Sequence, residues 1–200
     1  MKRYSIRYIG LFMFIAILAG GCSQLSGSSD GNSNSQKATA SDNRFAFRLY
    51  EQLKSDRENV FVSPYSISSA LAMTYTGARE QTRAEMSDAL GFPEDNEQLG
   101  KQYRALANHL HSLADSGLVL NVANSLWAQK DYGFSRDFVR TNRDYFSAGL
   151  KEVDFKRQHR AIREQINQWV EQKTNDKIQD MIAEGVLDRM TRLVLVNAIY

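Results

Sequence analysis

The chain has 200 residues, of which 42% are hydrophobic and 24% charged, with 25 Lys and Arg against 23 Asp and Glu. This composition is typical of a globular protein and excludes wholesale disorder, collagen and a protein with many membrane spans. The single cysteine excludes an internal disulfide and a cysteine-based zinc site. The net charge of +2 is too small for nucleic-acid binding through phosphate neutralisation.

The first 21 residues are predicted to be a secretory signal peptide. Three basic residues, Lys2, Arg3 and Arg7, precede an uncharged apolar run over residues 9–19, and two glycines follow it. This order of basic, apolar and small residues is the pattern of a signal peptide. As a helix the apolar run extends only about 16 Å, which is short for a bilayer and argues against the alternative, an N-terminal signal anchor.

Cys22 follows this signal directly. Residues 18–22, Leu-Ala-Gly-Gly-Cys, resemble the lipobox of prokaryotic lipoproteins, with one small residue more than the usual pattern. The resemblance implies that Cys22 is lipidated and begins the mature chain. Because acyl chains hold a soluble domain on a membrane, we expect an extracytoplasmic protein that is lipid-anchored to the cell membrane. The alternative is a secreted protein with a free cysteine.

Residues 22–43 are predicted to comprise the lipidated Cys22 and a disordered linker. The segment from Ser23 to Asn43 is rich in Ser, Gly and Asn and too polar to form a core. A flexible chain of this length reaches roughly 25 Å. Once residues 1–21 are removed, 22 basic residues stand against 23 acidic ones, so the mature chain is nearly neutral.

The folded part, residues 44–200, is predicted to begin with a helix and a short strand. Apolar residues at four-residue spacing, Phe45, Leu49 and Leu53, indicate a helix that ends near Ser55. The apolar residues 60–62 that follow predict a buried strand.

Two well-marked helices come next. Ser63 is predicted to cap a helix whose first residue is Pro64 and which runs to about Tyr75, with small residues around most of its circumference. The spacing Thr82-x-x-Glu85 predicts a capping box at the start of another helix, and Gly91 and Pro93 are its stop signals.

The remaining elements alternate between helix and strand. In chain order they are a helix over Gln98–Leu113, a strand over Leu118–Trp127, a helix from Ser135 through Tyr145, a strand over Val153–Phe155, a helix over Ala161–Thr174 and a strand over Arg192–Tyr200.

The last strand is apolar on both faces apart from Asn197, which predicts a position in the middle of a sheet. An apolar strand without neighbours is a pairing template for other chains. We therefore expect the natural protein to continue beyond Tyr200.

Catalytic signatures are absent from the sequence. It contains no G-x-S-x-G elbow, H-E-x-x-H motif, P-loop or G-x-G-x-x-G motif, so we expect no enzyme and no cofactor. His109 and His111 diverge on a helix and do not form a metal site. Acidic residues lie close in sequence to the basic run over residues 156–160. The solvent-exposed start of a helix therefore explains this run better than a binding site for a polyanion.

The order of residues from Asn59 to Thr82, NVFVSPYSISSALAMTYTGAREQT, closely resembles the serpin segment that leads from a strand of sheet B through helix B to helix C. Residues 123–127 are similar to the second strand of sheet A, residues 166–178 to helix F and its exit, and residues 195–200 to the start of the third strand of sheet A. Glu80 stands where the family usually has Gly, and Asn175-Asp176 replaces a turn that commonly contains glycine.

The resemblance implies an α+β fold in which N-terminal helices pack on part of a large mixed sheet, sheet A. It covers about residues 44–200 and corresponds to the N-terminal half of a serpin domain. Serpins inhibit serine proteases, and in some members cysteine proteases, through a reactive loop that is cleaved and then inserts into sheet A. In the family this loop follows the part that the resemblance covers.

Ser63, Ser66 and Asn197 match the family's shutter, the place where sheet A opens. Short hydroxyls and an amide suit a place where hydrogen bonds must be exchanged as strands separate. For the two serines, capping and close packing are alternative explanations.

Three functions stay open at this point. The leading hypothesis is a membrane-tethered serpin that inhibits serine or cysteine proteases. The second is a non-inhibitory serpin-like lipoprotein that serves as a binding or structural module, and the third is an extracytoplasmic enzyme without known motifs.

Overall fold

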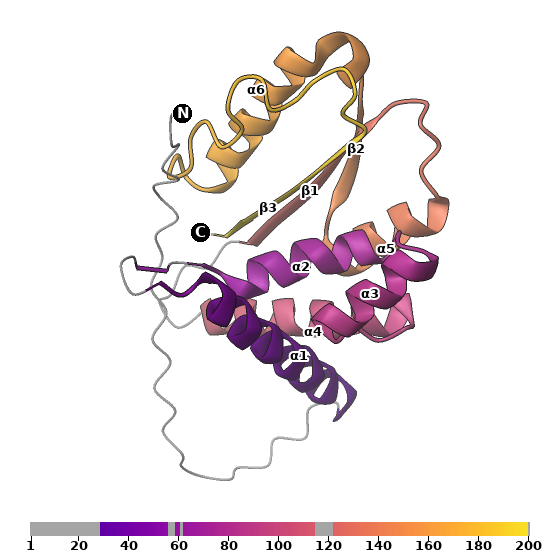
Figure 1. Cartoon of the computed structure of the whole chain (residues 1–200), viewed down its shortest axis with the longest axis vertical. Coiled ribbons are helices and arrows are strands. Elements are labelled where there is room, and N and C mark those ends of the chain that lie inside the picture. The colour runs from indigo at the N-terminus through magenta and orange to yellow at the C-terminus, as the bar shows by residue number, and fades with distance from the viewer. Residues whose placement is uncertain (1–28, 56–58, 61, 115–121, 200) are drawn as a thin grey trace.

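The computed structural model describes residues 29–55, 59–60, 62–114 and 122–199. The predicted signal peptide, Cys22 and the start of the predicted linker lie outside the described residues. Figure 1 shows a group of helices on one side of a small sheet and a single long helix on the other side.

The chain contains both helices and strands, and its sheet has an antiparallel as well as a parallel pair, in agreement with the expected α+β class. The helices are α1 (Ser29–Leu53), α2 (Pro64–Tyr75), α3 (Glu80–Leu90), α4 (Asn96–Ala114), α5 (Arg136–Phe146) and α6 (Phe155–Lys173), and the strands are β1 (Val122–Gln129), β2 (Gly149–Val153) and β3 (Leu193–Ile199).

The sheet has the strand order β2-β1-β3 in the described residues. β1 pairs in parallel with β2 and antiparallel with β3, with Asn124 opposite Asn197. Within the described residues β1 lies in the middle and β3 at an edge, so the predicted middle position of the last strand is not tested on its other side. The apolar faces of a strand are buried by the layers above and below the sheet. Burial of both faces therefore does not show that the strand has a neighbour at each of its edges.

Alternate side chains of the strands enter two separate cores. Leu126 and Leu195 face the helical group formed by α1 to α5, and Trp127 and Val196 face α6. The first core contains a row of aromatic rings, and the second combines side chains of α6, of the segment after it and of the strands. The sheet thus lies between two apolar layers, which explains its apolar strands.

The predicted linker is corrected by α1, which begins at Ser29. Ala38 and Asp42 are buried, and the hydroxyl of Ser41 donates to the carbonyl of Leu90 at 2.8 Å. The linker prediction rested on polar composition. Single small or polar residues at the correct helical positions are enough to dock this segment on α3 and α4.

α2 confirms the expected capping. The backbone N–H of Ser66 donates to the Ser63 hydroxyl at 3.3 Å, and Pro64 is the first helical residue. Ser68 and Ser69 are buried, and α2 packs against α1 and β3. Small side chains let these neighbours approach the helix closely.

α3 does not use the predicted capping box. The helix begins at Glu80, its N-cap Arg79 makes no side-chain cap bond, and Thr82 lies inside it. Gly91 ends the helix with φ +69°, as its stop signal predicts. The helix starts early even though the φ of Glu80 is +49°.

Two predicted strands also differ from the structure. Val153 ends β2, Asp154 is the N-cap of α6 and Phe155 is its first residue, so the predicted strand Val153–Phe155 is wrong. The buried ring of Phe155 anchors a helix start rather than a strand. Val60 and Val62 are not in a strand either, because a strand needs a hydrogen-bonded partner and none of the described strands pairs with them.

Candidate functional site

The predicted shutter residues lie together where α2 meets the edge strand β3. The side-chain amide of Asn197 donates to Oδ1 of Asn124 on the neighbouring strand at 2.6 Å. The hydroxyl of Ser66 donates to Oδ1 of the same Asn197. Asn197 therefore uses both ends of its amide, one within the sheet and one toward α2.

Two more hydrogen bonds extend this row of polar groups. The Asn124 amide donates to the carbonyl of Phe146 at the end of α5, at 2.9 Å, and Ser63 accepts from the backbone of Ser66. We call this set, formed by Ser63, Ser66, Asn197, Asn124 and the Phe146 carbonyl, the Asn197 network. It connects α2, β3, β1 and α5 through hydrogen bonds that each involve at least one side chain.

The network is half-buried, and this matters for its chemistry. Ser66, Asn124 and Asn197 are all partly exposed, so water can replace a protein partner when one of these bonds breaks. A neutral hydrogen bond of this kind contributes only about 1 kcal/mol net. The Asn197 network can therefore hold α2 against the sheet and still be exchanged at small cost.

Asn124 is the residue that the shutter assignment missed. Its sequence signal is weaker than that of Asn197, because Asn124 stands next to Ser125 in β1, whereas the neighbours of Asn197 are apolar. The register places the two asparagines directly opposite each other, and pairing between distant strands cannot be read from local sequence.

Hydrogen bonds join α6 to the segment between α6 and β3, residues 174–192, which we call the returning segment. The side-chain amide of Asn167 donates to the carbonyl of Ile182 at 3.0 Å, and the N–H of Ile182 donates to Oδ1 of Asn167 at 2.9 Å. Arg163 donates to the same carbonyl at 3.1 Å. Asn167 and Ile182 are 7% and 8% exposed, so these bonds are shielded from water.

Lys151, at the sheet edge, lies over two tryptophan rings, Trp127 of β1 and Trp169 of α6. The Nζ of Lys151 is 4.2 Å from the ring centre of Trp127 and 5.7 Å from that of Trp169. Burial, together with the charge of Lys173, lowers the pKa of Lys151. The aromatic faces partly compensate for the lost hydration of this amine.

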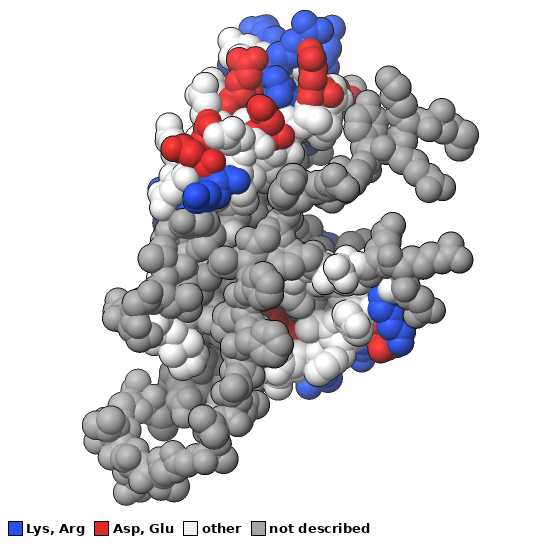
Figure 2. All heavy atoms as spheres, turned by 90° about the vertical axis from the view of Figure 1, so that its left-hand side faces the viewer, with Lys and Arg blue, Asp and Glu red and all other residues white. Residues whose placement is uncertain are grey.

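Charges of both signs gather over the end of the molecule that carries α6. Figure 2 shows Lys and Arg interspersed with Asp and Glu there. The basic run of residues 156–160 lies at the start of α6. A mixed surface of this kind does not attract polyanions strongly.

In the described ranges no group of three or more His, Cys, Asp and Glu side chains is placed to hold a metal ion. His109 and His111 are exposed on α4. None of the described helices combines the length and the apolar character that a membrane span requires.

The chain matches known proteins over almost all of the described fold. A family model described as serpin (serine protease inhibitor) matches residues 40–200. An uncharacterised serpin-like protein of Thermococcus kodakarensis is 39% identical over 158 residues, covering 79% of this chain and 37% of its own. The leukocyte elastase inhibitor of Bos taurus is 38% identical over 167 residues, covering 82% and 44%.

Solved structures agree with these sequence matches. Emu ovalbumin superposes with a TM-score of 0.70 at 29% identity, over 81% of this chain and 46% of its own. An Arabidopsis serpin in its native stressed conformation superposes with a TM-score of 0.66 at 26% identity, over 88% and 44%. The chain belongs to the serpin family, and it spans less than half of the length of these relatives.

Proposed function

We propose that residues 40–200 are the N-terminal part of a protease inhibitor that acts by the serpin mechanism. The family match and the 38% identity to an elastase inhibitor support this class of function. The observation that carries the mechanism is the hydrogen bond from Ser66 to Asn197 at the edge strand β3. In this proposal the additional strand is admitted to the sheet beside β3.

In this proposal the sheet moves and α2 stays in place. Asn197 remains bonded to Asn124 within the sheet, while its bond to Ser66 is broken and remade as the strands slide over the end of α2. A half-buried, neutral bond suits this task, because its loss leaves no charge unpaired and no donor fully buried. Insertion then releases energy stored in the uncleaved protein.

α6 moves with the sheet in the same mechanism. Its apolar face packs on Trp127 and Val196, and the bonds between Asn167 and Ile182 hold it to the returning segment. The helix, that segment and the strands beneath are thus one block, which can shift relative to α2 without loss of its own core.

Inhibition is tested by complex formation. The whole protein, purified from the cells that make it, is incubated with pancreatic elastase, chymotrypsin, trypsin and papain, and each mixture is boiled in detergent. We expect a complex of summed mass with at least one protease. Cleaved protein and fully active protease in all four mixtures would contradict inhibition and favour the non-inhibitory alternative.

We also propose that the protein is extracytoplasmic and held on the membrane by lipidated Cys22. The support is the lipobox-like sequence that ends at Cys22 after a basic and apolar leader. In a bacterial host, labelled palmitate should be incorporated into the protein and not into the Cys22→Ser variant. The variant should leave the membrane fraction, and equal membrane retention of the two proteins would reject the anchor.

A further inference from the structure

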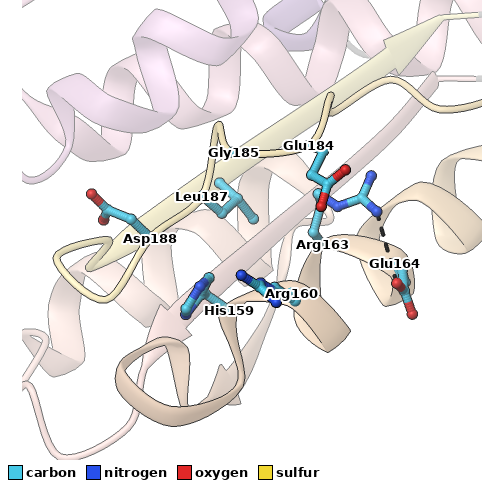
Figure 3. A pocket seen from close by; sticks show the side chains of 8 residues that line it. All are labelled: His159, Arg160, Arg163, Glu164, Glu184, Gly185, Leu187 and Asp188. Carbon is cyan, nitrogen blue, oxygen red and sulfur yellow. Dashed lines mark ion pairs between the residues drawn. The ribbon is translucent and has the colours of Figure 1, made fainter.

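A groove separates α6 from the segment that follows it. Its volume is about 280 Å³, and it is bounded by the start of α6 and by residues 184–188. Figure 3 shows His159 and Arg160 projecting from the helix, with Glu184 and Leu187 on the opposite wall. The groove lies away from the Asn197 network, and the proposed inhibition assigns it no role.

Opposite charges line the groove, and several of them form no ion pair with another described residue. The ion pair between Arg163 and Glu164, at 3.7 Å, is the only one formed among the eight described residues that line it. Asp188 accepts hydrogen bonds from the backbone of Met190 and Thr191. Arg160 on the helix and Glu184 on the facing wall therefore have their charged ends available to a ligand.

The remaining wall adds an apolar contact and an unsatisfied polar atom. Leu187 is 8% exposed and belongs to the core under α6. The Nδ1 atom of His159 is buried without a hydrogen-bond partner among the described residues. The groove thus combines a free cation, a free anion and an apolar surface within the size of one small molecule.

We propose that this groove binds a free α-amino acid with an apolar side chain. The guanidinium of Arg160 matches a carboxylate in a two-pronged arrangement, and the carboxylate of Glu184 matches the ammonium group. The side chain of the ligand lies against Leu187. A simple anion would be repelled by Glu184 and Asp188, and a simple cation by Arg160 and Arg163.

The bound amino acid would connect α6 to the returning segment. Arg160 and Glu184 are solvent-exposed, and exposed ion pairs are weak, so we expect a Kd on the order of 1 mM for so small a ligand. Binding would slow hydrogen exchange in α6 and in residues 184–188. This inference stands whether or not the protein inhibits proteases.

The test is titration of the full chain with L-leucine, followed by calorimetry and by amide chemical shifts. Two half-ligands complete it: 4-methylpentanoate, which lacks the ammonium group, and isoamylamine, which lacks the carboxylate. We expect saturable binding of L-leucine and at least tenfold weaker binding of each half-ligand. Absence of a saturable response to L-leucine at 20 mM, or binding of either half-ligand within twofold of L-leucine, would overturn the proposal.

Variants locate the site. Arg160→Gln and Glu184→Gln should each weaken L-leucine binding at least tenfold, and the exchange of both charges, Arg160→Glu with Glu184→Arg, should restore part of it. Arg136→Gln and Glu94→Gln remove charges from exposed positions outside the groove and should bind like the parent. Equal binding by the parent and both groove variants would place the ligand elsewhere and reject the site.

Discussion

Asn167 and Ile182 exchange two hydrogen bonds across 15 positions of the chain, with the side-chain amide of one residue meeting the backbone N–H and carbonyl of the other. This pair holds the returning segment on α6 where the two cross. The carbonyl of Ile182 has a second donor in Arg163, but among the described residues its N–H bonds only to Asn167.

Asn167→Ala is therefore expected to lower the free energy of unfolding by about 1–3 kcal/mol, because the buried N–H of Ile182 loses its partner. Urea denaturation measures this loss, and hydrogen exchange should be faster at Ile182 than in the parent. Gln168→Ala, at the exposed neighbouring position, is the control. A loss of the same size in the control would show that the pair has no special role.

Ser66 and Asn197 should be energetically coupled. Ser66→Ala and Asn197→Ala are each expected to lower the free energy of unfolding by about 1 kcal/mol, and the double variant by less than the sum, because either change alone removes their shared bond. Denaturation of the four proteins gives the coupling energy.

Thr74→Ala is the matched control for this cycle. Its hydroxyl bonds within α2, to the carbonyl of Ala70, and it should add to Asn197→Ala without coupling. A coupling between Ser66 and Asn197 no larger than that between Thr74 and Asn197 would mean that the bond does not hold α2 to the sheet.

The local sequence correctly predicted those helix ends that depend on a single capping residue. Ser63 and Gly91 cap their helices as expected because both effects act within one turn. The start of α1, the N-terminus of α6 and the central position of β1 were not predicted. These three features depend on contacts between residues that are far apart in the sequence. Ser41 of α1, for example, bonds to the carbonyl of Leu90, and α6 packs on Trp127.

For the candidate site too, the sequence identified some residues, whereas others depend on the tertiary structure. The resemblance identified Ser63, Ser66 and Asn197, and the structure brings the three together in one network. Asn124 and the asparagine that fastens α6 to Ile182 became visible only with the tertiary structure. A polar residue in an apolar strand or helix face can be noticed in a sequence, but its partner is set by packing.

Glu80 occupies a backbone conformation that favours glycine, with φ +49°, at the position where the family usually has Gly. Glu80→Gly should raise the free energy of unfolding by about 0.5–1 kcal/mol, since strain relief exceeds the entropy that glycine loses. Thermal or urea denaturation measures the gain. Glu85→Gly, inside the same helix, should instead lower the free energy of unfolding by about 1 kcal/mol. If both variants are less stable than the parent, the backbone of Glu80 is not strained.

Asp42 is a buried carboxyl that makes stability depend on pH. Its Oδ1 accepts from the hydroxyl of Tyr103 at 2.8 Å, while Oδ2 is buried without a partner among the described residues. Burial raises the pKa of Asp42 above its ordinary value of 3.8, and the hydroxyls of Ser68 and Tyr103 offset this only in part. Burial and the charge of Asp42 also raise the pKa of Tyr65 to about 12.

The sign of the effect follows from linkage. A carboxyl whose pKa is raised on folding binds its proton more tightly in the folded protein, so its contribution to stability is fully present below pH 3.8 and is lost as the pH rises through the folded value. Asp42→Asn keeps an acceptor for Tyr103 and removes the charge. Its stability relative to the parent should therefore increase as the pH rises from 4 to 7.

Urea denaturation of both proteins across that range measures the difference. Asp88→Asn, at an exposed position on α3, is the control and should change with pH like the parent. A stability difference between parent and Asp42→Asn that stays constant from pH 4 to 7, or falls, would show that the raised pKa of Asp42 does not govern the pH dependence of folding. A rising difference would mean that the buried carboxylate of Asp42 destabilises the contact between α1 and α4 at neutral pH.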